Sequence, residues 1–174
     1  MRLFIAIDIP EEIKNQIKEI KEQIKIDGKA NFIDAEKIHL TLKFLGDVPD
    51  SQAEEIKQSL SKISFEPFEA ITSELGVFPN ENRIRVIWLG LKNHEHLKLL
   101  KQEIDKALPD FKDDHDFHAH LTIARVKFLN NKQELLEQIK KIKIQPKTFK
   151  ITNFKLYKST LTPEGPIYEE LGVY

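Results

Sequence analysis

The feature that most constrains this chain is a short stretch that occurs twice. His39-Leu40-Thr41-Leu42 and His120-Leu121-Thr122-Ile123 read almost identically, and their histidines lie 81 positions apart. Successive side chains of a β-strand face opposite sides of the sheet. Each stretch therefore predicts a strand that presents an imidazole and a hydroxyl on one face and aliphatic side chains on the other.

Other parts of the sequence match at the same interval. Arg2 to Ile7 falls on Arg83 to Trp88, and two helical patterns follow with small slips. The interval predicts a two-fold internal repeat, approximately 2–80 and 83–161, within a single domain of 1–174 that ends in a C-terminal tail. Each repeat has the order strand, helix, His-x-Thr strand, helix, strand.

The hydrophobic periodicity predicts where these elements lie. Stripes of apolar residues indicate helices at Glu11 to Ile26, Ser51 to Ile63, His94 to Leu108 and Lys132 to Ile142. A loop through Phe32 is expected before the first His-x-Thr strand, and one strand is expected over Thr148 to Tyr157. The expected fold is α+β, with two pseudo-symmetric lobes, each a mostly antiparallel sheet with helices on its outer face, and an active-site cleft between them.

Composition limits the classes of function. The chain has 27 basic and 28 acidic residues, so any contact with nucleic acid must come from a local basic patch. Cysteine is absent, which excludes a disulfide framework, a thiolate metal site and a cysteine nucleophile. No apolar run has the length of a membrane span, and no signal peptide precedes the first strand, so we expect a cytoplasmic protein that does not bind membranes.

Two histidines facing one cleft suit a reaction that needs a base and an acid together. An imidazole pKa near 6.5 makes both protonation states accessible at neutral pH. The hydroxyls of Thr41 and Thr122, on the same faces as the histidines, are placed to donate to oxygens that become more negative in a transition state. In-line cleavage of a phosphodiester, such as a strained cyclic ribose phosphate, fits this set of groups without a metal.

These motifs resemble a known family. The two His-x-Thr stretches, their spacing, the segment Arg83 to Leu91 and the tail Ser159 to Tyr168 are similar to the RNA 2',3'-cyclic phosphodiesterases of the two-histidine (2H) phosphoesterase superfamily, historically called 2'-5' RNA ligases. The resemblance covers nearly the whole chain. It implies hydrolysis of RNA 2',3'-cyclic phosphate ends to 2'-phosphates with no cofactor, and the reverse joining of 2'-5' linkages as a side reaction.

The resemblance also implies roles for individual residues. By motif position, His39 is the proton donor to the departing 3'-oxygen and His120 is the proton acceptor that activates water. Thr41, Thr122 and Arg125 are expected to bind phosphate oxygens. The symmetric arrangement alone leaves the acid and base assignment open. The implied partner is RNA with a 2',3'-cyclic phosphate end, such as a tRNA fragment, and a monomer is expected because two lobes already supply a complete site.

Four residues near the motifs have competing interpretations. Strict alternation puts Arg125 on the face opposite His120, unless the strand bulges near Ala124 or Arg125 acts from the rim. Phe44 and Phe78 are candidates for base stacking, although aromatic residues near strand ends more often belong to a core. Lys43 shares the face of Thr41 by alternation, and is interpreted either as a phosphate contact or as a solvated charge.

Two other classes of function are also considered. His115, His118 and His120 lie close to Asp114 and Asp116, and the His-x-His spacing would suit a metal site of a metallohydrolase. An RNA-end binding module without turnover would keep the cleft but would not need His39 and His120. The metal-independent cyclic phosphodiesterase is the preferred hypothesis.

Overall fold

The computed structural model describes residues 1–92, 94–113 and 116–174. The helices are α1 (Glu11–Gln23), α2 (Ala53–Leu60), α3 (Glu95–Ala107) and α4 (Lys132–Lys141), with short 3-10 turns at Ala35–Lys37 and Asp50–Gln52. The strands are β1 (Arg2–Asp8), β2 (Gly28–Phe32), β3 (His39–Asp47), β4 (Phe68–Asn80), β5 (Arg83–Lys92), β6 (His120–Leu129), β7 (Thr148–Ile151), β8 (Lys155–Thr162) and β9 (Gly165–Val173).

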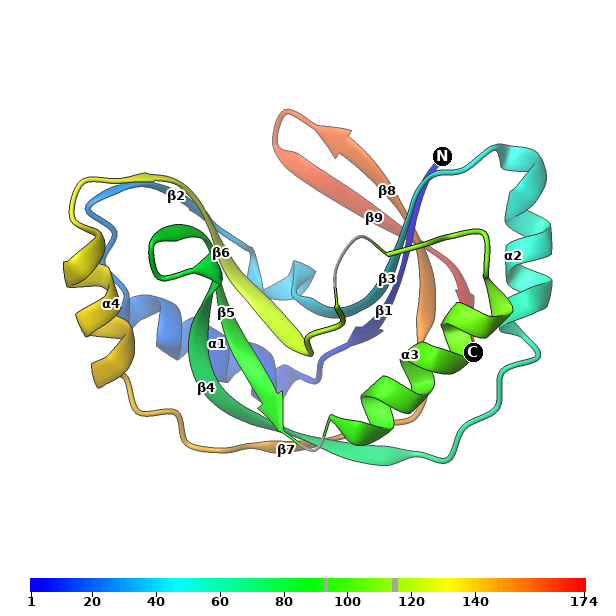
Figure 1. Ribbon diagram of the computed structural model, residues 1–174, viewed down its shortest axis with the longest axis horizontal. Helices are drawn as coiled ribbons and strands as arrows, with labels where there is room; N and C mark the ends of the chain where they lie inside the picture. Colours follow the sequence, from blue (N-terminus) through cyan, green and yellow to red (C-terminus); the bar gives the residue numbers. More distant parts are fainter. Residues whose placement is uncertain (93, 114–115) are drawn as a thin grey trace.

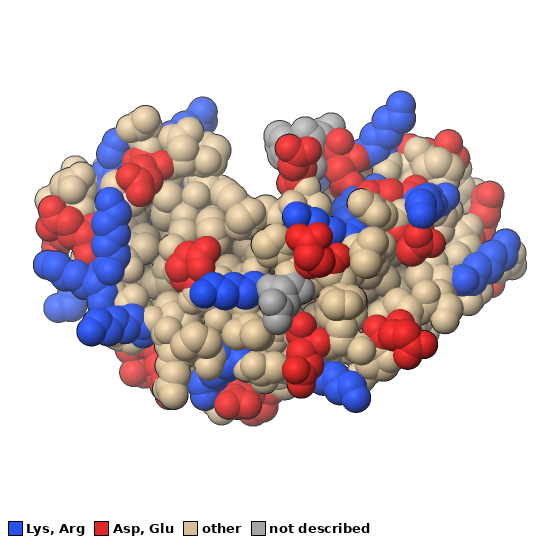
Figure 2. Space-filling view, turned by 60° about the horizontal axis from the view of Figure 1, so that its bottom comes forward, with Lys and Arg blue, Asp and Glu red and all other residues tan. Residues whose placement is uncertain are grey.

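Within the described residues, the nine strands form one curled sheet in the order β7-β4-β5-β6-β3-β1-β8-β9, with β2 also paired to β6. Every pairing is antiparallel. The two halves of the sheet meet where β3 and β6 pair through Leu40 and Leu121. This confirms the predicted α+β class and its two lobes, and the surface is hollowed between them at the upper edge in Figure 2.

Each lobe contains strands from both halves of the chain. The first lobe consists of β1, β3, β8 and β9, whereas the second consists of β2, β4, β5, β6 and β7. Figure 1 shows the hairpin of β8 and β9 beside β1 and β3, although it comes last in the sequence. The crossing chain segments interlock the lobes, so neither lobe is a continuous stretch of sequence.

Helices cover the outer faces of the sheet (Figure 1). In α1 the predicted stripe of Ile13, Ile17 and Ile20 is buried, and the glutamine between them, Gln16, bonds through its side-chain nitrogen to the Gln145 carbonyl of the second lobe. On the side of the first lobe, α2 and α3 pack together. No helix in the described part of the chain is long and apolar enough to cross a bilayer.

The structure corrects several predicted boundaries. Helix α1 ends at Gln23, three residues before the predicted end, because Ile24 adopts an extended backbone. The loop expected through Phe32 is only partly a loop, because the chain up to Phe32 forms the strand β2, which pairs with β6. The expected strand over Thr148 to Tyr157 is two strands, since β7 pairs with β4 in one lobe and β8 pairs with β1 in the other.

Candidate functional site

The two His-x-Thr stretches lie side by side at the centre of the sheet. Leu40 and Leu121, which pair with each other, are fully buried, so the residues on either side of them face the opposite surface. Continuing the antiparallel register by one residue sets His39 beside Thr122 and Thr41 beside His120. All four of these polar side chains are partly accessible. The predicted histidines and threonines therefore meet in one place between the lobes.

Each histidine is held in the same way by its own backbone. The Nδ1 atom of His39 lies 2.8 Å from the Lys37 carbonyl oxygen, and Nδ1 of His120 lies 2.7 Å from the His118 carbonyl oxygen. A carbonyl only accepts hydrogen bonds, so each Nδ1 carries a proton. The neutral tautomer then has a free lone pair on Nε2. Both rings thus present the nitrogen that exchanges a proton with a substrate or a water molecule.

The surroundings of the two histidines lower their pKa values. Burial is the main cause for both, and the hydrogen bonds to the backbone carbonyls oppose it. The positive charge of Arg125 lowers the pKa of both rings further, which places the guanidinium within electrostatic range of each. The two rings differ in their charged neighbours: the carboxylate of Asp8 raises the pKa of His39, whereas His118 lowers the pKa of His120 and no carboxylate of the described residues raises it.

A bulge in β6 resolves the orientation of Arg125. In the pairing with β5, Ile87 lies opposite Ala124 and Trp88 lies opposite Thr122, so Ile123 is an extra residue. Ile123 and Ala124 are consecutive and both fully buried, and the alternation resumes one residue later. Arg125 therefore shares the face of His120 and Thr122, as the bulge interpretation predicted.

Bulges in β3 have the same effect on the residues after Thr41. In the pairing with β1, Leu42 and Leu45 are extra residues. Phe44 is consequently 63% exposed with its ring 6.2 Å from that of Phe4, on the face of His39 rather than with Leu40 and Leu42 as strict alternation predicts. Phe44 stands five residues after His39, the position that Arg125 occupies after His120.

Both interpretations of Lys43 were wrong. Its side chain is only 2% exposed and points away from the cleft, toward α3. There its ammonium group lies 2.6 Å from Asp105 and 2.9 Å from Asp113, and Lys101 pairs with the same two carboxylates. This ion-pair cluster of two buried lysines and two partly exposed carboxylates ties β3 to α3 and to Asp113.

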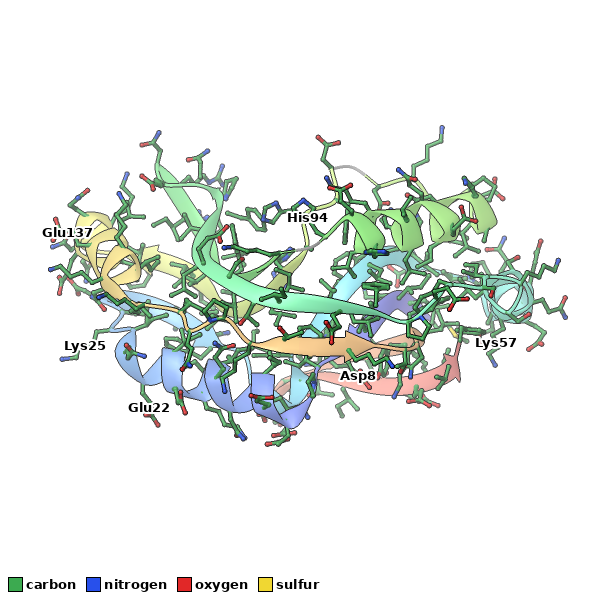
Figure 3. All side chains as sticks on the ribbon, turned by 90° about the horizontal axis from the view of Figure 1, so that it is seen from below. Asp8, Glu22, Lys25, Lys57, His94 and Glu137 are labelled. Atoms are coloured by element: carbon green, nitrogen blue, oxygen red, sulfur yellow. The ribbon has the colours of Figure 1, made fainter. Side chains whose placement is uncertain are left out.

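Aromatic side chains from three strands surround His39. Its ring lies 4.9 Å from the ring of Phe4 and 5.3 Å from that of Tyr168, and Tyr157 stacks on Phe4 at 5.4 Å. The hydroxyl of Tyr157 donates to Asp8 at 2.6 Å. Burial alone would raise the pKa of Asp8, but the bonds from Lys155 and Tyr157 outweigh it and lower the pKa. Asp8 is thus a fixed negative charge near His39, and Figure 3 shows it near the middle of the molecule.

A second aromatic group surrounds His120. The ring of Phe78 lies 4.9 Å from that of His120 at nearly a right angle, and 5.0 Å from that of Trp88. Trp88 in turn contacts His118 at 4.8 Å. Phe78 is partly buried between these rings, so it supports His120. Sequence reasoning missed Phe4, Trp88 and Tyr168 as neighbours of the histidines, since cross-strand contacts depend on a register that the sequence does not state.

Only two of the three histidines of the suggested metal site lie within the described residues. His115 lies outside the described residues, and the ring centres of His118 and His120 are 6.3 Å apart. Among the described residues, no group of three histidine, aspartate or glutamate side chains is arranged to hold a metal ion. The Nδ1 atom of His120 is already bonded to a carbonyl, which leaves one ring nitrogen for other chemistry.

The chain is similar to known proteins in sequence and in fold. The model of the family "LigT like Phosphoesterase" matches the chain twice, over residues 7–88 and 89–168. An RNA 2',3'-cyclic phosphodiesterase of Methanocaldococcus jannaschii is 45% identical over 97% of both chains, and one of Thermotoga maritima is 39% identical over 98% of this chain and 93% of that protein. The crystal structure of Escherichia coli LigT in its apo form superposes with a TM-score of 0.79 at 25% identity, covering 99% of this chain and 95% of that one. Another structure, of LigT complexed with phosphate, has a TM-score of 0.75 at 25% identity and the same coverage.

Proposed function

The chain belongs to the LigT-like phosphoesterase family and is a cyclic phosphodiesterase acting on RNA, and we propose that His39 and His120 catalyse the hydrolysis without a metal. The observation that carries the proposal is the pair of histidines, each anchored through Nδ1 and set on adjacent central strands. The anchored tautomer makes Nε2 of each ring available for proton transfer. The substrate is a 2',3'-cyclic phosphate end, and the product is a 2'-phosphate.

The reaction needs one proton removed and one proton delivered. Nε2 of His120 takes a proton from water while the water oxygen attacks phosphorus. The bond between phosphorus and the 3'-oxygen breaks, and protonated His39 gives its proton to that oxygen. The ring opens to a 3'-hydroxyl and a 2'-phosphate, and the two histidines have exchanged protonation states. A proton transfer with the solvent restores them.

The charge that builds up on the phosphate meets donors on the same face. Thr41 and Thr122 supply hydroxyls, and Arg125 supplies a guanidinium that attracts the non-bridging oxygens. The bulge that turns Arg125 toward the histidines supports this role. E. coli LigT has been crystallised with phosphate, which is consistent with a phosphate site in this fold.

Asp8 supports the assignment of His39 as the acid. Its negative charge favours the protonated imidazole of His39, and no carboxylate among the described residues has this effect on His120. A general acid must enter the reaction protonated and a general base must enter it neutral. The difference between the two environments therefore matches a donor at His39 and an acceptor at His120.

The terminal nucleoside is expected to rest against the first lobe. Phe44 is largely exposed beside Phe4, and a base stacked on such a ring contributes roughly 1–3 kcal/mol. Phe78 is held between rings of the protein and is a weaker candidate for stacking. The substrates we propose are cytoplasmic RNA fragments such as tRNA halves, cleaved by a monomer, with 2'-5' joining as the reverse reaction. The two internal repeats, 2–80 and 83–161, would each supply one histidine and one threonine.

The test is the identity of the product in the absence of metal. An oligoribonucleotide with a 2',3'-cyclic phosphate end is incubated with the wild-type protein in EDTA, and the end group is identified by mass and by its resistance to a 3'-specific phosphatase. A 2'-phosphate as the only product supports the proposal. A 3'-phosphate would contradict the assignment of the leaving oxygen, and no turnover would favour the RNA-end binding module.

A further inference from the structure

Charge is distributed unevenly between the two lobes. Strands β2, β5 and β6 carry six basic residues, one on β2, three on β5 and two on β6, and no aspartate or glutamate: Lys29, Arg83, Arg85, Lys92, Arg125 and Lys127. The strands of the first lobe carry four basic and four acidic residues: Arg2, Lys43, Lys155, Lys158, Asp8, Asp47, Glu169 and Glu170. Three of those four basic residues form ion pairs. The other two strands of the second lobe, β4 and β7, carry Glu69, Glu74 and Lys150, so its strands hold seven basic and two acidic residues, and the positive charge is concentrated on β2, β5 and β6.

Two further bulges turn basic side chains toward the cleft. In the pairing of β4 with β5, Arg85 is an extra residue, and in the pairing of β2 with β6 the extra residue is Lys127. Arg85 lies between the buried Ile84 and the partly buried Val86, and it is exposed. Since Ile84 and Ile87 face the core, Arg85 and Val86 face the cleft side.

The same argument places Lys127. Val126 is buried and Leu129 packs against the core, so the two residues between them, Lys127 and Phe128, face outward on the side of Arg125. Arg85 donates through its guanidinium to the Lys127 carbonyl at 2.7 Å, which joins the two bulges side by side. Among the described residues, neither of these side chains forms an ion pair with a carboxylate, and Glu81 of the nearby turn pairs with Lys140 instead.

The pseudo-symmetry shows what the first lobe has at the matching positions. At the interval of 81 residues, Arg85 corresponds to Phe4 and Arg125 corresponds to Phe44. The lobe of His39 therefore presents aromatic rings where the lobe of His120 presents guanidinium groups. Rings suit a nucleobase, whereas cations suit phosphates. This difference gives the two ends of the site different ligands.

We propose that Arg85 and Lys127 bind the backbone phosphates of an RNA strand upstream of the cyclic end, so that the second lobe is a track for single-stranded RNA. The inference rests on the proposed function and adds a preference for substrates of several nucleotides. Lys127 is seven residues beyond His120, and seven residues of strand span about 23 Å. A mononucleotide at the histidines does not reach that far, but an oligonucleotide does.

The test compares two substrate lengths. Values of kcat/KM are measured for a nucleoside 2',3'-cyclic monophosphate and for a pentaribonucleotide with a 2',3'-cyclic phosphate end, over a series of salt concentrations. The variants are the double substitution R85Q/K127Q and a control, K57Q/K106Q, which removes two charges from α2 and α3. Lys57 lies on α2 at the right-hand end of Figure 3, on the outer side of the molecule.

The track predicts a loss that depends on length. R85Q/K127Q should lose about tenfold in kcat/KM on the pentanucleotide, retain its activity on the mononucleotide, and show a salt slope smaller by about 1.4, the value for two phosphates of a single strand. The control should match the wild type on both. Equal loss on both substrates, or no loss on either, would overturn the track while leaving the hydrolysis intact. A wild type inactive on both substrates would refute the proposed function and the track with it.

Discussion

Replacing Arg125 tests whether the bulge in β6 delivers a catalytic group. The bulge puts this guanidinium on the face of both histidines, and its charge lowers the pKa of each ring. A hydrogen bond to a charged partner contributes about 1.5–3 kcal/mol, and each 1.4 kcal/mol corresponds to about tenfold in rate. We therefore expect Arg125→Gln to reduce kcat/KM by roughly 10- to 100-fold on a cyclic mononucleotide.

The pH profile distinguishes this role from a structural one. Without the nearby positive charge, the pKa values of His39 and His120 both rise, so the bell-shaped profile of kcat/KM should move to higher pH. Arg125→Lys keeps the charge without the bidentate geometry and should leave the profile in place with an intermediate rate. The assay is initial-rate hydrolysis across the pH range, with far-UV circular dichroism to confirm folding. A wild-type rate and an unshifted profile for Arg125→Gln would refute the reasoning.

Three further predictions concern acid, the ion-pair cluster of Lys43 and metals. Because burial lowers the pKa of His39 and His120 below the unfolded value near 6.5, the unfolded state binds more protons than the folded state at acid pH. The free energy of unfolding, measured by urea titration, should therefore fall below about pH 6.5, and it should fall less in a variant with alanine at both positions. The same pH dependence in the variant and the wild type would contradict the buried placement of the two rings. Lys43→Met leaves two carboxylates facing only Lys101, and should cost about 2 kcal/mol in the free energy of unfolding, while Lys57→Met on the outer face should change it little; equal stabilities would show that the cluster is not important for the fold. EDTA should not change the hydrolysis rate, and activity lost in EDTA and restored by zinc would instead support a metallohydrolase.

The sequence predicted the parts of the site that depend on local pattern. The repeated His-x-Thr stretches gave the two central strands, and alternation placed each histidine and threonine on one face, as the structure shows. The amphipathic stripe of α1 was likewise readable from Ile13, Ile17 and Ile20. These features need only the period of the element, which every residue in the stretch reports.

What the sequence left open depends on partners that lie far away in the chain. The bulges that turn Phe44 into the cleft and bury Lys43 arise from the register between β1 and β3, and alternation gives no sign of them. The sequence also does not show that β7 pairs with β4 in the second lobe while β8 pairs with β1 in the first lobe. The break between β7 and β8 was therefore missed. In the sequence, Asp8 cannot be distinguished from a solvent-exposed residue at the end of a strand. Its hydrogen bond from Tyr157, which is 149 residues away in the chain, depends on the fold.

The most direct test of the paired histidines uses a substrate whose leaving atom needs no proton. In a nucleoside 2',3'-cyclic phosphate with sulfur in place of the 3'-oxygen, the departing thiolate leaves without a general acid. We expect His39→Ala to be severely impaired on the oxygen substrate and to recover most of its rate on the sulfur substrate, whereas His120→Ala stays impaired on both. Recovery by His120→Ala instead would reverse the acid and base assignment, and wild-type rates for both variants on the oxygen substrate would contradict the account of catalysis by two histidines.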